Sequence, residues 1–385
     1  MRAYNKVELE NYFLAEEAEK LHNKKFLSKE RLEELKKELK QLKSNSNNLF
    51  RFLFFLLGNF LFSTVIGAFS VILFSIGGDQ FELMVFFYAL VAYVGLELLV
   101  KLKFFRHGLD DSFILIAQIA FLIGVGIVSE SVIVVFAFMI IAGLFFALRF
   151  LHTISAVLAY IGLLGLFSSA ILQHDLLPRF YLSFVCFLLA VFVYFIAVHL
   201  RKKEHLFPYF KMLDTLQMVT LLLGYLSVNY LVVREIASEL MGLNVSLESD
   251  IPFAVVFYGL TFLLPLLYFF VGIKNKDRII LYTGLITLAL GFSSIRYYYY
   301  ILPLESVLVI SGLLLFGLAY FSIQKLKNKT EGITFQPDRD TNNSFLLNAQ
   351  VLMTVANATT PPAANSGPMD FGGGGFSGGG AGDTF

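Results

Sequence analysis

Ten long apolar stretches constrain this 385-residue chain more than any other feature. A helix needs about 20 predominantly apolar residues to cross a lipid bilayer. Hydrophobic residues make up 57% of the chain and charged residues only 15%, whereas a soluble domain carries about 25% charged residues. The sequence therefore predicts an all-α polytopic membrane bundle of about ten transmembrane helices. The predicted spans are 50–76, 81–102, 112–128, 131–148, 151–172, 179–200, 211–233, 251–273, 278–295 and 302–323.

The positive charges test this layout, because the cytoplasmic loops of membrane proteins carry an excess of Lys and Arg. With the N-terminus placed in the cytoplasm, 27 of the 30 Lys and Arg residues fall on the inner side. The outer side holds only Arg179, Arg234 and Arg296. A missed or extra span would scramble this asymmetry. We therefore expect both ends of the chain to be cytoplasmic, on either side of a membrane domain at 50–324.

Residues 1–49 are predicted to form a cytoplasmic helical hairpin. The first helix covers 6–22, and its apolar stripe consists of Val7, Leu14, Ala18 and Leu21. The second begins at Ser28, a good N-cap residue, and continues to about residue 43. Its narrow apolar stripe is typical of a two-helix, coiled-coil-like seam and consists of Leu32, Leu35, Leu39 and Leu42. Residues 44–48 are a polar linker to the membrane.

The tail at 325–385 is predicted to be cytoplasmic. Its segment 344–358 is short and apolar, so it is expected to dock on the hairpin or to lie on the bilayer. The end from Phe371 to Phe385 is rich in glycine and cannot build a hydrophobic core. We expect it to be disordered.

Ionisable side chains near the bilayer centre are the usual mark of a functional site in a membrane protein. The predicted spans place none there: Glu97 and Asp214 fall near inner ends, and Arg296 and Glu305 at outer ends. Uncharged polar side chains lie deeper, and Pro265 is expected to kink its span. The candidates for a polar path or a helix interface are Glu97, Gln118, Asp214, Gln217, Pro265, Arg296 and Glu305.

Motifs for catalysis and cofactor binding are missing from the sequence. The single cysteine, Cys186, excludes a disulfide framework and a cysteine-based metal centre. His152 and His199 are expected to approach one another on the inner side, together with Asp110, Asp111 and Asp214. No histidine pair, however, has the i, i+4 spacing that favours metal binding. We therefore predict no enzyme activity, no cofactor, no metal and no nucleic-acid partner.

The hairpin carries a resemblance to known proteins. Its stretch KKFLSKERLEELKKEL at 24–39, followed by many spans, resembles uncharacterised multipass membrane proteins of bacteria, and the Phe- and Lys-rich style is similar to that of Bacteroidota. The glycine-rich end is similar to the tails of envelope proteins that carry a TPM domain, although no such domain is present here. The resemblance implies the architecture and a place in the bacterial inner membrane. It implies no site residues.

Two functions fit these observations. The first is a structural or interaction role in which the cytoplasmic ends bind a protein partner while the spans contact the lipid bilayer. The alternative is a solute transporter, because ten spans with both ends inside is also the layout of drug/metabolite transporters. A two-fold internal symmetry with a polar cavity would favour transport, and a solid apolar bundle would favour the interaction role.

Overall fold

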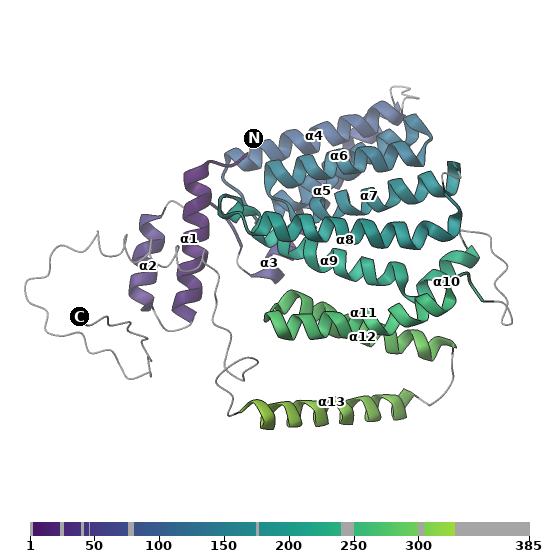
Figure 1. The fold of residues 1–385 in the computed structure, drawn as a ribbon. Coiled ribbons are helices and arrows are strands. Elements are labelled where there is room, and N and C mark those ends of the chain that lie inside the picture. The colour runs from purple at the N-terminus through teal and green to yellow at the C-terminus, as the bar shows by residue number, and fades with distance from the viewer. Residues whose placement is uncertain are drawn as a thin grey trace, which may run out of the picture.

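The computed structural model describes residues 3–23, 27–39, 42–45, 47–75, 81–174, 177–239, 250–298 and 304–327. Within these ranges most of the chain is helical, the remaining residues lie in turns and loops, and one isolated bridge joins Lys43 and Phe104 (Figure 1). The predicted all-α class is therefore confirmed for the described residues. The helices are α1 (Lys6–Asn23), α2 (Lys29–Glu38), α3 (Asn48–Ser75), α4 (Phe81–Lys101), α5 (Leu109–Ser129), α6 (Val132–Phe150), α7 (Thr153–His174), η1 (Arg179–Tyr181), α8 (Leu182–Arg201), η2 (Glu204–Tyr209), α9 (Phe210–Val228), α10 (Tyr230–Glu239), α11 (Ala254–Asn275), α12 (Arg278–Tyr298) and α13 (Leu304–Leu326).

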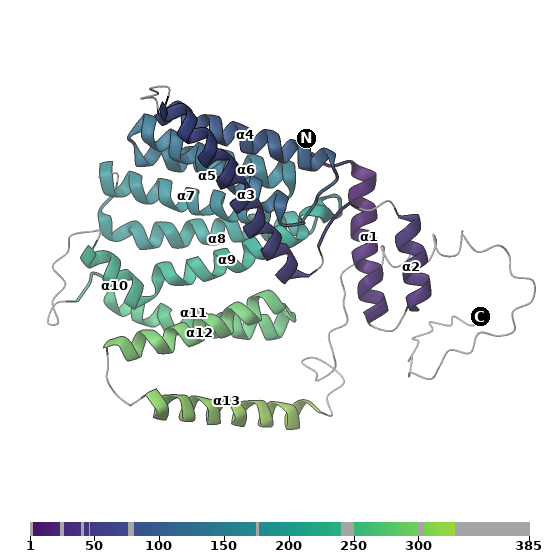
Figure 2. The same ribbon diagram turned by 180° about the vertical axis from the view of Figure 1, so that it is seen from behind.

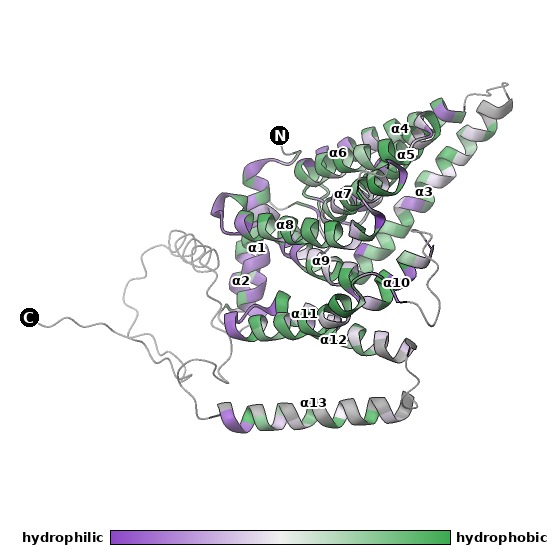
Figure 3. Cartoon of the chain, turned by 45° about the vertical axis from the view of Figure 1, so that its right-hand side comes forward, coloured by the Kyte–Doolittle hydropathy of each residue, from purple (hydrophilic) through white to green (hydrophobic). Residues whose placement is uncertain are grey.

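Seven helices in the described ranges are long and apolar enough to cross a membrane: α3 to α8, with η1 included in the α8 segment, and α11. Helices α9 and α10 pass the same test only as a bent pair. The outer surface of these helices is apolar, and Leu188, Phe192 and Phe195 of α8 are each more than 60% exposed. Such a surface is unfavourable in water and favourable in lipid. Figure 3 shows the hydrophobic colouring on the bundle, in contrast to the hydrophilic colouring of α1 and α2.

The bundle is built from consecutive helical hairpins that lie side by side: α4 with α5, α6 with α7, α8 with α9, and α11 with α12. Close approach within a hairpin depends on small residues. A Cβ atom on Gly143 of α6 would lie 2.7 Å from the carbonyl oxygen of Ser155 in α7. Helix α3 crosses the bundle obliquely and packs on α5 (Figure 2). Helices that are neighbours in the chain are therefore mostly neighbours in space.

The predicted span 211–233 is not one straight helix. Helix α9 ends at Val228, α10 begins at Tyr230, and the two are bent by 66°. Between them lies Asn229, whose Oδ1 accepts a hydrogen bond from the Val232 N–H at 3.4 Å. Asparagine is a favoured N-cap, so this side chain begins a new helix and replaces the backbone bonds that the break removes.

Helices α1 and α2 lie side by side and antiparallel, since Lys36 pairs with Glu19 and His22 contacts the carbonyl of Leu27. The predicted extent of the second helix and its four-leucine stripe are wrong. Helix α2 ends at Glu38, and Leu42 instead packs in the main core, where it is 4% exposed. The stripe predicted for the first helix also fails at Val7, which is 61% exposed.

Backbone pairing explains the early end of α2. The N–H of Lys43 donates to the carbonyl of Lys103 at 2.7 Å, and the N–H of Phe105 donates to the carbonyl of Lys43 at 3.0 Å. Residues 42–45, predicted partly as helix and partly as a free linker, therefore pair with the α4–α5 loop. The predictions for the apolar tail segment 344–358 and for the glycine-rich end concern residues outside the described ranges.

A candidate functional site at the hairpin end of the bundle

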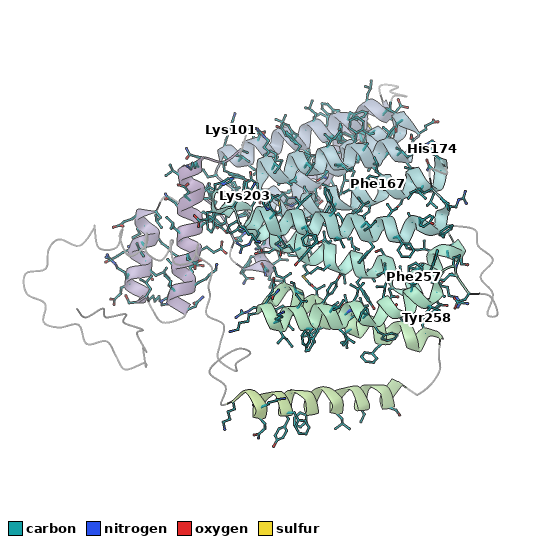
Figure 4. The ribbon with its side chains drawn as sticks, in the orientation of Figure 1. Lys101, Phe167, His174, Lys203, Phe257 and Tyr258 are labelled. Atoms are coloured by element: carbon teal, nitrogen blue, oxygen red, sulfur yellow. The ribbon has the colours of Figure 1, made fainter. Side chains whose placement is uncertain are left out.

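A cluster of buried polar side chains lies at the end of the bundle that faces α1. Figure 4 labels Lys101 and Lys203 at this end and His174 at the opposite end. The cluster draws its members from three spans and from the α6–α7 connection, which places His152. We call it the hairpin-end cluster, and it consists of Arg51, Asp110, Asp111, Gln118, His152 and Ser155.

The centre of the hairpin-end cluster is an ion pair between α3 and α5. Arg51 donates from Nε to Oδ2 of Asp111 at 2.6 Å and from Nη2 to Oδ1 at 2.8 Å. The Asp111 side chain is 9% exposed and that of Arg51 is 28% exposed. A two-pronged pair of this kind fixes orientation as well as distance. It is therefore a geometric tie that holds α3 against α5.

The neighbouring carboxylate, Asp110, organises the turn before α5. It accepts backbone N–H bonds from Arg106 at 2.7 Å, from His107 at 2.9 Å and from Gly108 at 3.0 Å. This turn needs unusual backbone angles, and Gly108 has a φ of 107°. A Cβ atom there would lie 2.1 Å from the carbonyl oxygen of Arg51. Glycine at this position thus lets α3 approach the start of α5.

A chain of hydrogen bonds starts at His152, beside the ion pair, and leads deeper into the bundle. His152 Nε2 lies 3.6 Å from Oδ1 of Asp111, and its Nδ1 lies 2.8 Å from Oγ of Ser155. Ser155 Oγ then donates to Oε1 of Gln118 at 2.7 Å. Burial lowers the pKa of His152 to about 4, although the Asp111 charge opposes this shift. His152 is therefore neutral at physiological pH.

A cavity of about 20 Å³ lies beside the cluster. A cavity of about 10–15 Å³ already holds one water molecule, so this one has the size for a single water-sized species. His152 Nε2 has no hydrogen-bond partner among the described residues, and neither does Gln118 Nε2. The described residues contain no group of three or more metal-ligating side chains. The lining residues are Arg51, Phe105, Arg106, Asp110, Asp111, Ile114, Phe150, Leu151, His152, Thr153 and Lys211.

The segment around α1 covers this end of the bundle. The N–H of Ala3 donates to the carbonyl of Arg149 at 2.9 Å, and the ring of Phe13 lies edge-on to that of Phe207 at 5.0 Å. Arg106 lies under α1, 5.5 Å from the ring of Phe13 and 3.8 Å from Glu16. Since the backbone of Arg106 also binds Asp110, one turn joins the hairpin to the cluster.

Of the candidates named from the sequence, only Gln118 belongs to the cluster. Glu97 accepts from Tyr93 at 2.8 Å and from Arg149 at 2.7 Å. Asp214 accepts from Arg201 at 2.7 Å.

The other candidates stand apart from the cluster or cannot be placed. Gln217 is buried on α9, and α11 continues through Pro265. Arg296 lies in α12 and Glu305 in α13, but their side chains are outside the part that the structure describes.

Sequence reasoning missed the pairing of Arg51 with Asp111 and the part played by Ser155. From the sequence, Arg51 is only one of the positive charges on the inner side, and Asp111 is only a carboxylate expected near the histidines. His199 and Asp214, expected to join His152, do not: His199 is exposed. One signal was available, since Gly108-Leu109-Asp110-Asp111 places two carboxylates at the start of an apolar stretch, where helix N-termini favour anions.

No known protein family, curated protein or solved structure matches this chain significantly. The function is therefore argued from the geometry alone.

Proposed function

We propose that this protein is a ten-span bacterial inner-membrane protein whose hairpin, α1 with α2, is a cytoplasmic module for binding a protein partner. The ten spans are α3 to α8, the bent pair α9–α10, and α11 to α13. The orientation is supported by the charges at the hairpin end, where Lys101 and Lys203 lie (Figure 4). Cytoplasmic loops are the ones enriched in such residues. A reporter that is active only in the cytoplasm should work after Lys203 and fail after His174.

The attachment of the hairpin is the observation that carries this proposal. Helix α1 and the residues before it contact the last turn of α6 through Arg149, and the α4–α5 and α8–α9 connections through Phe105 and Phe207. Helix α2, by contrast, buries Leu32 and Leu35 against α1. The membrane domain therefore holds α1 firmly, and α1 presents α2 to the solvent. A rigid mount of this kind lowers the entropy cost of binding a partner.

The free face of α2 indicates the chemistry of the partner. Its exposed residues are Lys29, Glu30, Glu33, Glu34, Lys37 and Glu38, which carry more negative than positive charge. An acidic face favours a basic surface on the partner, because complementary charges steer association.

In vivo photo-crosslinking tests this role. A photoreactive amino acid at Lys37 should give discrete higher-mass adducts in cells of the native host, and one at His174 should not. Reversing charge at Glu30, Glu33 and Glu34 to Lys should remove the adducts, whereas the matched change Glu10→Lys on α1 should leave them. If Lys37 gives no adduct in a correctly inserted protein, or if the triple reversal changes nothing, the proposed role is wrong.

A transporter is the second candidate, and the break at Asn229 favours it. Discontinuous helices often line the substrate site of transporters. Asn229 is 1% exposed, donates to Tyr225 at 2.8 Å and accepts from Ser294 at 3.1 Å, so this polar group lies inside the bundle.

Thiol accessibility separates the two candidates. In a variant with Cys186→Ser and Asn229→Cys, a transporter should expose the new thiol to a membrane-impermeant reagent during its cycle. A closed bundle should leave it unreactive. Thr261→Cys, on the neighbouring face of α11, serves as a second probe of the same polar region.

A further inference from the structure

A second feature of the bundle, separate from the hairpin-end cluster, is a groove of about 430 Å³. Helices α4 and α6 form its walls and α5 its floor. Its volume lies within the range of small-molecule sites, and its lining is almost entirely apolar. The lining residues are Phe86, Ala89, Leu90, Tyr93, Ala117, Phe121, Phe138, Ile141, Ala142, Phe145 and Phe146.

The groove exists because small side chains alternate with large ones. Ala89, Ala117 and Ala142, one from each helix, are all less than 9% exposed. The phenylalanines of the lining come from all three helices, and the ring of Phe121 on α5 lies 6.0 Å from that of Phe86 on α4 and 5.9 Å from that of Phe138 on α6. The methyl side chains thus lie among larger aromatic ones and leave space between the helices.

Both walls change from apolar to charged at the hairpin end. On α4, Phe86, Tyr93, Glu97 and Lys101 follow one another at helical spacing on a single face. On α6, Phe138, Ala142, Phe145 and Arg149 do the same. Arg149 donates from Nε and Nη2 to Glu97, and Tyr93 donates to the same carboxylate oxygen.

This arrangement has the dimensions of one lipid chain. The 12 residues from Phe86 to Glu97 span roughly 16 Å at 1.5 Å per residue. One leaflet of the hydrocarbon core is about 15 Å deep. The groove lining from Phe86 to Tyr93, together with the helix surface on to Glu97, thus covers the depth of one acyl chain and ends in charge where a headgroup would lie.

A helix from a second copy would not fit in the same space. A helix about 10 Å wide and 16 Å long occupies roughly 1,200 Å³, about three times the groove volume. A single file of methylene groups is much thinner. The charges at the mouth favour an anionic headgroup, since Lys101 is exposed and the Arg149 side chain is 29% exposed. Arginine has five N–H donors, and the two hydrogen bonds from Arg149 to Glu97 use two of them.

We propose that this groove binds one acyl chain of an anionic phospholipid, whose phosphate is held at the hairpin end by Arg149 and Lys101. The proposal requires the helices to lie in a bilayer, but it does not depend on the hairpin having a protein partner. It adds a lipid site to the described structure. Because the carbonyl of Arg149 also accepts the Ala3 N–H, the site adjoins the attachment of the hairpin.

The absence of Trp from the sequence makes a direct test available. A Phe138→Trp variant places one fluorophore in the groove, and Phe192→Trp places one on the lipid-facing surface of α8 as a matched control. Each variant is reconstituted in phosphatidylcholine vesicles that contain a small fraction of phosphatidylglycerol with brominated acyl chains, which quench Trp on contact. Leu90→Trp is the second groove variant, used if Phe138→Trp does not insert.

Quenching at the groove should report a local phosphatidylglycerol fraction about fivefold above that in the bilayer, because each basic residue near anionic lipid contributes to its accumulation. The α8 control should report the bulk fraction. Adding Arg149→Gln should return the groove signal toward the bulk value. Equal quenching at both positions would overturn the proposal, as would enrichment that survives Arg149→Gln. Loss of quenching in the groove would also overturn it, since a protein segment would then fill the space.

Discussion

The buried ion pair between Arg51 and Asp111 gives the sharpest test of how the membrane domain is held together. Replacing Asp111 by Asn keeps the size of the side chain and one carbonyl acceptor, but removes the negative charge. The guanidinium of Arg51 then lies against a neutral group, and Asp110 is committed to backbone N–H groups. The variant therefore leaves a positive charge without its partner at a nearly closed site.

The size of the effect follows from the exposure of the two side chains. Removing one partner of a fully buried ion pair costs about 3–5 kcal/mol of folding free energy. Asp111 is 9% exposed, but Arg51 is 28% exposed, so water stabilises part of its charge. We therefore expect the lower limit, about 3 kcal/mol. The pair of Arg201 with Asp214 is the matched control, with a contact of 2.7 Å, against 2.6 Å for Arg51 with Asp111, but with 23% and 37% exposure. Asp214→Asn should cost about 1 kcal/mol or less.

Titration of the solubilised protein with sodium dodecyl sulfate in mixed micelles measures both values, with near-ultraviolet circular dichroism of the tyrosines as the signal. The double variant Arg51→Gln with Asp111→Asn should be less destabilised than the sum of its single changes, because neither leaves an unpaired charge once the other is made. If Asp111→Asn and Asp214→Asn lower stability equally, or if the double variant is additive, the ion pair does not hold α3 to α5 as argued.

Three further changes follow from the same structure. Because burial lowers the pKa of His152 to about 4, against 6.5 for an ordinary histidine, only the unfolded chain takes up this proton between these values. The contribution of His152 to stability should therefore be full above pH 6.5 and fall by roughly 3 kcal/mol toward pH 4. The difference between the stability profiles of the protein and of His152→Gln measures this contribution, because the other titrating groups are common to both. Gly108→Ala should cost at least about 1–3 kcal/mol from its φ of 107° alone, whereas Gly67→Ala, with no atom near its Cβ position, should be neutral in thermal melts. Glu97→Gln should change the melting behaviour little, since an amide oxygen still accepts from Tyr93, and a large loss of stability there would show that the charge itself matters.

The positions of the membrane helices were readable from the sequence because lipid imposes one simple requirement on their outer faces. The predicted span 81–102 corresponds to α4, Phe81–Lys101, and 151–172 to α7, Thr153–His174. Boundaries of this kind follow from where apolar residues give way to polar ones. The break at Asn229 has no such signal, because the residues directly after it, Tyr230–Val233, are still apolar. The asparagine acts by capping a backbone end rather than by changing hydropathy.

Most of the candidate site could not be predicted from the sequence, because its contacts join residues that are far apart in the chain. Arg51 and Asp111 are 60 residues apart in the chain, and Ser155 and Gln118 are 37 residues apart. Their pairing depends on which helices cross, and periodicity within one helix does not determine that. Local pattern did identify Gln118 as a polar group deep in a span. It gave no partner for it, because the partner lies on α7.

Arg106 connects the hairpin to the hairpin-end cluster. Its side chain is fixed beneath α1 by the rings of Phe13 and Phe105, while its backbone N–H binds the carboxylate of Asp110. Any displacement of α1 must therefore either move this turn or break these contacts. Moving the turn shifts Asp110 and the cavity that contains His152. If α2 binds a partner as proposed, that contact is therefore coupled through α1 and Arg106 to the buried end of the membrane domain.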